Sequence, residues 1–425
     1  MQKKVDELDQ RLRVDERQKE LQDEESANSK RPSLTFGTSG VLIRSADDNL
    51  QLRLGIDLQV DGRFYPDGLL APANDGFLIR RARPAVSGTV FKYVDFYVRP
   101  DFGQGTTILY ESYVELKYFP RFLVRAGKFK PPVGLERLQS DDDTNFIERG
   151  LPTLLVPSRD IGYQISGDII ARRVNYAVGV FNGVADNSLS DAGTSSHKEY
   201  DGRLFLTPFA TGGPSESANP LRGLGFGIAA TGGPVDGLPL PAYKTLGQIT
   251  FFSFASGVTS AGHRTRLAPQ ASYYLGPFGL LAEFTRAEEG FQKGNLRHPI
   301  AFRSWQVQAS YLLTGEKKGF TSPAPKRNFD PLHHGGWGAV ELAVRVGDFE
   351  VERGIFDYGF ASITNSPRRA HECLGAVSWY LNRNLRLELN AGNTNFAGGA
   401  PVASATPDGN RLPEKTILTR FQVNF

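Results

Sequence analysis

The chain has 425 residues, a formal net charge of +3, 40% hydrophobic residues and one cysteine. Mean hydropathy is −0.32 and no apolar run reaches about 18 residues, which excludes a protein that crosses a membrane by helices. The small charge argues against nucleic-acid binding, and the single Cys373 excludes an intrachain disulfide and a cysteine-based metal cluster.

The first part of the chain, residues 1–31, is a highly charged arm that is rich in good helix formers. Apolar residues begin a heptad spacing at Val5, but the seam fails at Asp15. The pattern is compatible with a weak coiled coil and with a solvated or disordered arm. Residues 32–49 follow as a linker that has room for a small hairpin.

From Leu50 onward, apolar and polar residues alternate, which is typical of strands with two different faces. The segments LQLRLGIDLQVDGRF, SWQVQASYLL, LRLELNAG and TRFQVNF all show this pattern. About sixteen such segments occur, with few helical signals between them. A soluble sandwich would bury the apolar face as its core. The number of strands instead favours an all-β fold, a transmembrane antiparallel up-and-down β-barrel over residues 50–425.

The connections between these segments alternate between short and long. Short turns include LGPFG and LNRN, and the longer connections are expected around 64–76, 130–160, 183–196, 233–263, 288–300 and 348–367. An up-and-down barrel with one short-turn end predicts this alternation. Two connections on the short side, 209–222 and 315–335, are exceptions. An even number of strands leaves both termini at the short-turn, periplasmic end.

The most unusual connection is AGKFKPPVGLERLQSDDDTNFIERG and the residues after it. It begins as a strand, meets Pro131-Pro132 and continues as an irregular segment. A loop of about thirty residues is normally functional or disordered. Because this one is rich in Leu, Val, Pro and Phe, we predict that residues 130–160 fold into the barrel and narrow it.

These stretches resemble the phosphate-selective porin O and P family of Gram-negative outer membranes. The similar segments include GIDLQVDGRF, FLIRRA, AGKFKPPVGLER, NFIERG, YYLGPFGLLAEF, GWGAVELAVR and the terminal FQVNF. The resemblance implies a sixteen-stranded, trimeric barrel in the outer membrane. It also implies that anions such as phosphate pass through a pore lined by arginines and lysines.

The resemblance also implies site residues and shows departures from the family pattern. The paired pore arginines of the family fall on Arg80 and Arg81, and the basic residues of the constriction loop fall on Arg137 and Arg149. However, Asp57 stands where phosphate-specific relatives carry an arginine in their first strand. Residues 233–263 also lack the family's dense arginine cluster. A weaker and broader anion preference than strict phosphate selection is therefore expected.

Strand periodicity gives an independent assignment of the lumenal face. In the second strand the alternation groups Leu78 with Ala82, Val86 and Val90. Arg81 and Arg83 then point into the lumen, and Arg80 points outward unless a bulge re-aims it. The complete predicted anion-binding set is Arg80, Arg81, Arg83, Arg99, Arg125, Arg137 and Arg149, with Asp57 and Glu111 as lumenal counter-charges.

The sequence therefore predicts a passive porin for small anions, with phosphate and other oxyanions first and chloride also passing. Its partners would be outer-membrane lipid and further copies in a homotrimer, without a cofactor or metal. The alternatives are arginines that merely fill the wall, a plugged or structural barrel, a barrel enzyme with a Ser/His pair near one rim, and a soluble carbohydrate binder. The run Asp141-Asp142-Asp143 fits a solvated loop or partners for lumenal arginines better than a calcium site, because calcium ligands alternate along a loop.

Overall fold

The computed structural model describes residues 10, 13–14, 16–20, 32–66, 74–188, 191, 196–210, 219–333, 335–400, 406 and 408–425. The described residues of the N-terminal arm are helical. Most of the arm, and with it the choice between a coiled coil and a disordered arm, lies outside the described residues.

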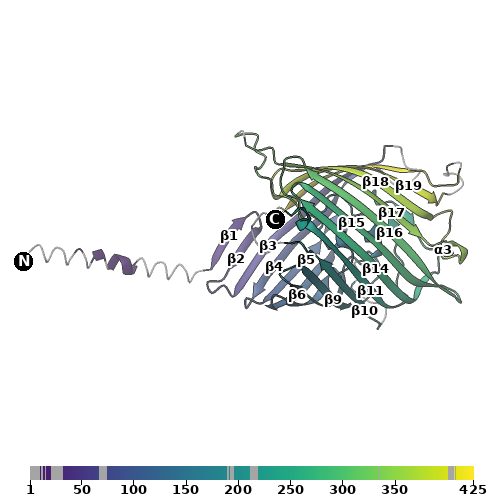
Figure 1. Cartoon of the computed structure of the whole chain (residues 1–425), viewed down its shortest axis with the longest axis horizontal. Coiled ribbons are helices and arrows are strands. Elements are labelled where there is room, and N and C mark those ends of the chain that lie inside the picture. Colours follow the sequence, from purple (N-terminus) through teal and green to yellow (C-terminus); the bar gives the residue numbers. More distant parts are fainter. Residues whose placement is uncertain are drawn as a thin grey trace, which may run out of the picture.

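In the described part of the chain, sixteen antiparallel strands close into one barrel (Figure 1). They are β3 Leu50–Phe64, β4 Gly76–Val90, β5 Val94–Asp101, β6 Ile108–Phe119, β7 Phe122–Phe129, β8 Asp160–Ile169, β9 Val174–Phe181, β10 Glu199–Leu206, β11 Leu224–Asp236, β14 Thr259–Leu275, β15 Phe278–Lys293, β16 Leu296–Leu312, β17 Ala339–Val351, β18 Pro367–Tyr380, β19 Leu385–Gly398 and β20 Glu414–Asn424. Neighbours in the chain pair with each other, and β20 pairs with β3 from Ile417↔Phe64 to Asn424↔Asp57. This last pairing leaves no open edge between the first and last strands, as the barrel prediction requires.

The linker contains the hairpin for which the sequence has room. Strands β1 Ser33–Gly37 and β2 Gly40–Arg44 pair with each other, and β2 also pairs with the first part of β3. The backbone of Phe425, at the end of β20, exchanges hydrogen bonds with Ile56. The hairpin therefore continues along β3 where β20 stops, and it lies at one end of the barrel (Figure 1).

The helical segments among the described residues are short. They are α2 Leu135–Leu138, α3 Gly354–Asp357 and the 3-10 segments η1 Gly103–Gly105, η2 Leu151–Leu155 and η3 Pro220–Gly223. None of the described helices is long and apolar enough to cross a membrane.

The two faces of the strands differ as the alternation predicts. Trp305 and Tyr311 in β16 are exposed on the outside, as are Phe421 and Phe425 at the C-terminus. Between them in β16, Gln306, Gln308 and Ser310 are buried inside the barrel. An apolar outer band with aromatic residues and a polar interior is the pattern of a barrel surrounded by lipid.

One predicted loop is wrong. The connection expected at 288–300 is a turn of two residues, because β15 and β16 stay paired to Lys293↔Leu296. Gly294 has φ 59°, a left-handed backbone that glycine adopts without a steric penalty. The alternation thus continues through residues that look loop-like in the sequence, and these two strands are among the longest in the barrel.

An apolar cluster fills part of the barrel interior near the long connections. It combines η2 with residues of the 237–258 connection, which contains the short strands β12 Tyr243–Lys244 and β13 Thr250–Phe252. Wall residues Phe302 and Phe349 pack against Tyr243 and Phe252, and Phe291 packs against Phe302. Part of the interior is therefore solid protein.

Candidate functional site

Residues 130–159, between β7 and β8, form a loop that is largely buried inside the barrel. Glu136 in this loop accepts a hydrogen bond of 2.9 Å from Gln306 of β16. Arg345 of β17 donates to the backbone oxygen of Glu148 over 3.0 Å. These contacts fasten the loop to the wall, so the prediction that it folds inward is confirmed.

The same loop is attached to the last strands of the barrel. Asn390 of β19 accepts a hydrogen bond of 2.8 Å from the backbone N–H of Ile147, and Arg420 of β20 donates to the backbone oxygen of Ile147 over 2.8 Å. At Gly150, an added Cβ would lie 1.7 Å from Gln306 Oε1. The loop therefore approaches the wall too closely for any larger residue to fit without a shift.

The connection between β16 and β17 supports the loop from the short-turn end. Gln139 donates to the backbone oxygen of Phe320 over 2.8 Å, and Asp143 accepts from the backbone N–H of Ser322 over 2.7 Å. Lys318 donates to Asn145 over 2.7 Å. These contacts explain why one of the two exceptional connections on the short side is long.

Four arginines surround the carboxylate of Asp141. Arg149 lies 2.8 Å from it, Arg81 lies 3.7 Å away, Arg159 lies 3.8 Å away, and Arg83 forms a further ion pair. Burial by itself would raise the pKa of Asp141, but the attraction of these arginines holds its pKa well below the usual range. The carboxylate is therefore ionised, and the prediction that the aspartate run supplies counter-charges is confirmed for Asp141.

The orientation of Arg80 is decided by a bulge in β4. Gln59 pairs with Arg81 and Val60 pairs with Ile79, which leaves Arg80 as the extra residue. Its guanidinium points inward and donates to Glu148 over 2.7 Å. The bulge also reverses which residues of β4 before Arg80 point inward and which point outward.

The bulge corrects one predicted face of β4. Leu78 lies across from the buried Asp61, whereas its neighbour Phe77 is exposed on the outside. Leu78 therefore shares the lumenal face of Arg81 and does not share the outer face of Ala82. An alternation counted through a bulge assigns every residue beyond it to the wrong side.

The two predicted basic residues of the loop are packed within it. Arg137 donates to the backbone oxygen of Thr153 over 2.6 Å and to Asn187 over 3.0 Å. Burial, together with the neighbouring Arg149 and Arg159, lowers the pKa of Arg137 to about 10. Arg149 is held by Asp141 and by backbone oxygens of the loop.

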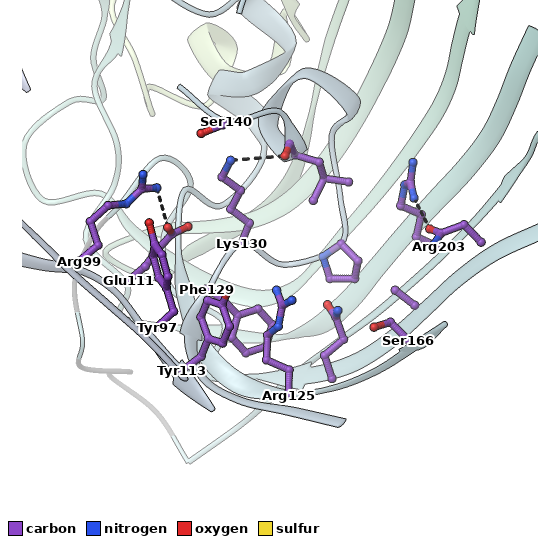
Figure 2. Close-up of a pocket in the computed structure, with 15 residues that line it drawn as sticks. Tyr97, Arg99, Glu111, Tyr113, Arg125, Phe129, Lys130, Ser140, Ser166 and Arg203 are labelled. Carbon is purple, nitrogen blue, oxygen red and sulfur yellow. Dashed lines mark hydrogen bonds and ion pairs between the residues drawn. The ribbon is translucent and has the colours of Figure 1, made fainter. Parts of the chain in front are cut away.

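A cavity of about 450 Å³ lies on the side of the loop that faces strands β5 to β10, opposite the side that is fastened to β16 to β20 (Figure 2). The lining consists of Tyr97, Arg99, Glu111, Tyr113, Arg125, Phe129, Lys130, Pro132, Leu138, Ser140, Gln164, Ser166, Asn175, Ala177 and Arg203. It contains four cationic side chains and a single carboxylate, Glu111. That carboxylate already pairs with Arg99 at 2.6 Å and with Arg159 at 2.8 Å. Arg125 pairs at 2.7 Å with Glu115 outside the lining, so the excess positive charge of the cavity comes from Lys130 and Arg203.

Two of the cavity's cations have no carboxylate partner among the described residues. Arg203 donates to Gln270 over 3.0 Å and to Asn175 over 2.9 Å. Lys130 donates to backbone oxygens of Leu138 and Gln139. Burial, with the positive charges of Arg159 and Arg149, holds the pKa of the Lys130 ammonium well below its usual range. An anion in the cavity would stabilise both cations.

Two further cavities continue from this one toward the short-turn end. One of about 220 Å³ shares Tyr97 and Tyr113 with it, and one of about 470 Å³ shares Tyr97 and Arg99. The second also includes Asn384 and Phe425, near the end of the barrel that carries the hairpin. The three cavities therefore adjoin one another along the wall between that end and the loop.

The predicted site residues thus fall into two groups. Arg99, Arg125 and Glu111 line the large cavity, and Arg83 and Asp57 line the cavity nearer the hairpin. Arg80, Arg81, Arg137 and Arg149 belong to the packed network that holds the loop. No cluster of three or more potential metal-ligating side chains occurs among the described residues.

Several lumenal cations were not found from the sequence. Lys130 and Arg203 line the cavity, and the loop is held by Arg159, Arg345, Arg386 and Arg420. The signal was present for those in strands: Arg345, for example, lies between Val344 and Val346, which points it to the polar face. Arg159 lies in an irregular segment, where alternation gives no information.

The depressed pKa of Lys130 predicts a pH-dependent pore. As pH rises, this ammonium should lose its proton in a range below the ordinary lysine value of 10.5, so the preference for anions should fall there. Lys130→Arg should keep its charge and show a flatter profile, because guanidinium stays protonated. Reversal potentials measured over the whole pH range below 10.5 in which the barrel stays folded would check this, and identical profiles for the two proteins would contradict it.

A closed barrel with an inward loop and cation-rich cavities in its interior defines a channel of the porin class. The chain belongs to the phosphate-selective porin O and P family, whose sequence pattern matches residues 49–425. It is accordingly an outer-membrane porin for anions. Comparison with curated proteins finds no match.

Solved structures share the fold at low sequence identity. The outer membrane channel DcaP of Acinetobacter baumannii is 9% identical with a TM-score of 0.57, covering 92% of this chain and 99% of its own. The anion-selective porin from Comamonas acidovorans is 12% identical with a TM-score of 0.55, covering 88% and 100%. The outer membrane protein OmpT of Vibrio cholerae is 10% identical with a TM-score of 0.54, covering 89% and 98%.

Proposed function

We propose that small anions cross this porin along the wall of strands β5 to β10, past Arg99, Arg125 and Arg203. The observation that carries the proposal is the cavity lining, which has four cations and one already paired carboxylate. Fixed guanidinium groups replace part of the hydration of an oxyanion with paired donors. Phosphate and related oxyanions are therefore the preferred ions, with chloride passing as well.

The cations of the passage are spaced so that an ion can both enter and leave. Arg99 and Arg203 lie on opposite sides of the cavity, with Lys130 and Arg125 between them (Figure 2). Arg99 and Arg125 are each paired to a glutamate, at 2.6 Å and 2.7 Å, whereas the partners of Arg203 among the described residues are neutral. Several sites of moderate strength support conduction better than one tight site.

The predicted arginines outside the cavity do not contact the anion directly in this proposal. Arg80, Arg81, Arg137 and Arg149 hold the loop in place and add positive potential to the constriction. Their guanidiniums already bind carboxylates, backbone oxygens or, for Arg81, the side-chain oxygen of Gln59. They act on a passing anion through the field, which is focused where the walls have a low dielectric constant.

The double variant Arg125→Gln with Arg203→Gln tests the pathway. Removing two of the four cavity cations should shift the channel from anion preference toward neutral selectivity, measured as reversal potential in asymmetric potassium chloride at low salt. The matched control is Arg286→Gln with Arg303→Gln, an exposed pair on the outer face of β15 and β16. Unchanged selectivity in the cavity variant, or an equal shift in the control, would contradict the assignment.

A plugged barrel is the second candidate, because the apolar cluster around Tyr243 and Phe252 fills part of the interior. A plugged barrel would give no steady conductance in a planar bilayer. The same recordings therefore decide between the two candidates.

We also propose that the protein assembles as a homotrimer with both termini in the periplasm. The family relationship supports the trimer, and OmpT of Vibrio cholerae, which shares the fold, has been solved in a trimer form. The even number of strands supports termini on one side. Crosslinking in intact outer membranes and protease accessibility of the N-terminal arm would test these two points.

A further inference from the structure

The large cavity is lined by more than cations. Three aromatic side chains, Tyr97, Tyr113 and Phe129, lie along its wall. Tyr97 and Tyr113 are stacked with ring centroids 5.5 Å apart, and Phe129 meets Tyr113 edge-on at 6.1 Å. An inorganic ion makes no use of such a surface, because its contacts are with charges and hydrogen-bond donors.

The arginines are stacked on these rings. The guanidinium carbon of Arg125 lies 4.3 Å from the ring centroid of Tyr113, and that of Arg99 lies 5.5 Å from that of Tyr97. Flat guanidinium groups held against aromatic rings present planar faces as well as N–H donors. The wall is thus suited to a ligand that has a flat body and a negative end.

The polar groups of the cavity are also available to a ligand. Within the described residues, the hydroxyl groups of Tyr97 and Tyr113 form no hydrogen bond. Arg203 and Lys130, the two cations that lack a carboxylate partner, lie at other positions around the cavity (Figure 2). A carboxylate bound there would be held by charge, while its body contacts the tyrosines.

The volume supports a ligand larger than phosphate. A cavity of about 450 Å³ falls in the range of roughly 300–1,000 Å³ that is usual for sites of organic ligands. A five-atom oxyanion would contact one or two cations and leave the rest of the cavity to water.

We infer that this cavity is a binding site for aromatic carboxylates, which the porin takes up in addition to inorganic anions. The inference rests on the proposed anion pathway and adds a substrate class to it. The carboxylate binds near Lys130, and the ring lies along Tyr97 and Tyr113. A site of moderate strength in the passage slows such an anion without trapping it.

The test compares two probes of equal charge, benzoate and acetate, as blockers of chloride current through single channels. Benzoate should reach half-block at a concentration roughly three- to tenfold lower than acetate, the range that aromatic stacking supports. The variant Tyr97→Leu with Tyr113→Leu keeps apolar side chains but removes the rings, and should lose this difference. Its chloride conductance and circular dichroism report whether the barrel is folded and open.

The chain offers a matched control in a second tyrosine stack between the same parts of the barrel. Tyr93 and Tyr118 are stacked at 4.8 Å near the β4–β5 and β6–β7 turns, and neither lines the cavity. Tyr93→Leu with Tyr118→Leu should retain the benzoate effect. Equal block by benzoate and acetate in a channel that prefers anions overturns the aromatic site alone. A channel without anion preference overturns the proposed function and the site with it.

Discussion

Asp141→Asn is expected to loosen the constriction loop and to lower the free energy of unfolding by about 3–5 kcal/mol, the usual cost of breaking a buried ion pair. The substitution keeps the size of the side chain but removes the one carboxylate that four arginines share. Arg81, Arg83, Arg149 and Arg159 would then repel one another inside the barrel. The loop should move away from them.

The expected observations are a larger and noisier single-channel conductance and a lower midpoint in denaturant-induced unfolding. A matched control is Asp168→Asn, since Asp168 is an exposed aspartate that hydrogen-bonds Asn175 over 2.8 Å. It should unfold like the parent. If Asp141→Asn leaves both conductance and unfolding unchanged, the ionic cluster does not hold the loop.

The second large effect is expected on the outer face of β9. Val178 is 51% exposed on the outside, whereas its neighbour Ala177 is 6% exposed and lines the cavity. Val178→Arg places a charge in hydrocarbon and should destabilise the barrel by about 2–4 kcal/mol if this position is near the midplane. Ala177→Arg adds a cation to the cavity and should strengthen the preference for anions.

The two variants can be compared directly because the residues are adjacent in sequence and both receive the same arginine side chain. Unfolding in lipid vesicles gives the stability of each variant, and reversal potentials give its selectivity. Similar destabilisation at both positions would contradict the assignment of one face to lipid and the other to the lumen.

Alternation in the sequence predicts the barrel well, because lipid and water impose opposite demands on successive residues. The pairing of β20 with β3 and the exposure of Trp305 and Phe421 follow from that pattern. The pattern fails where a local backbone feature intervenes. The bulge at Arg80 shifts the face of Leu78, and a glycine turn replaces the predicted loop at 288–300.

The site is less predictable than the fold, because it depends on contacts between distant segments. Lumenal arginines such as Arg99 and Arg125 follow from the alternation, and both line the cavity. Which arginines remain available to an ion depends on where the loop lies, and no periodicity reports this. The sequence predicts Arg81 and Arg149 as pore residues, yet both form ion pairs with Asp141.

The position of the loop assigns two tasks to different parts of the barrel wall, holding the loop in place and lining the cavity. The loop forms hydrogen bonds with four residues of β16 to β20, which are Gln306, Arg345, Asn390 and Arg420. The cavity, in contrast, lies against β5 to β10. In the proposed pathway, β16 to β20 therefore support the loop, and β5 to β10 face the permeating anion.

This separation has an evolutionary consequence. Residues such as Gln164, Ser166 and Asn175 face the cavity and make no contact that fastens the loop. They can be exchanged for side chains of other charge or size while the opposite wall keeps the constriction in place. A barrel built in this way can change the solutes that it admits through a few substitutions on one side. The contacts that stabilise the fold stay the same.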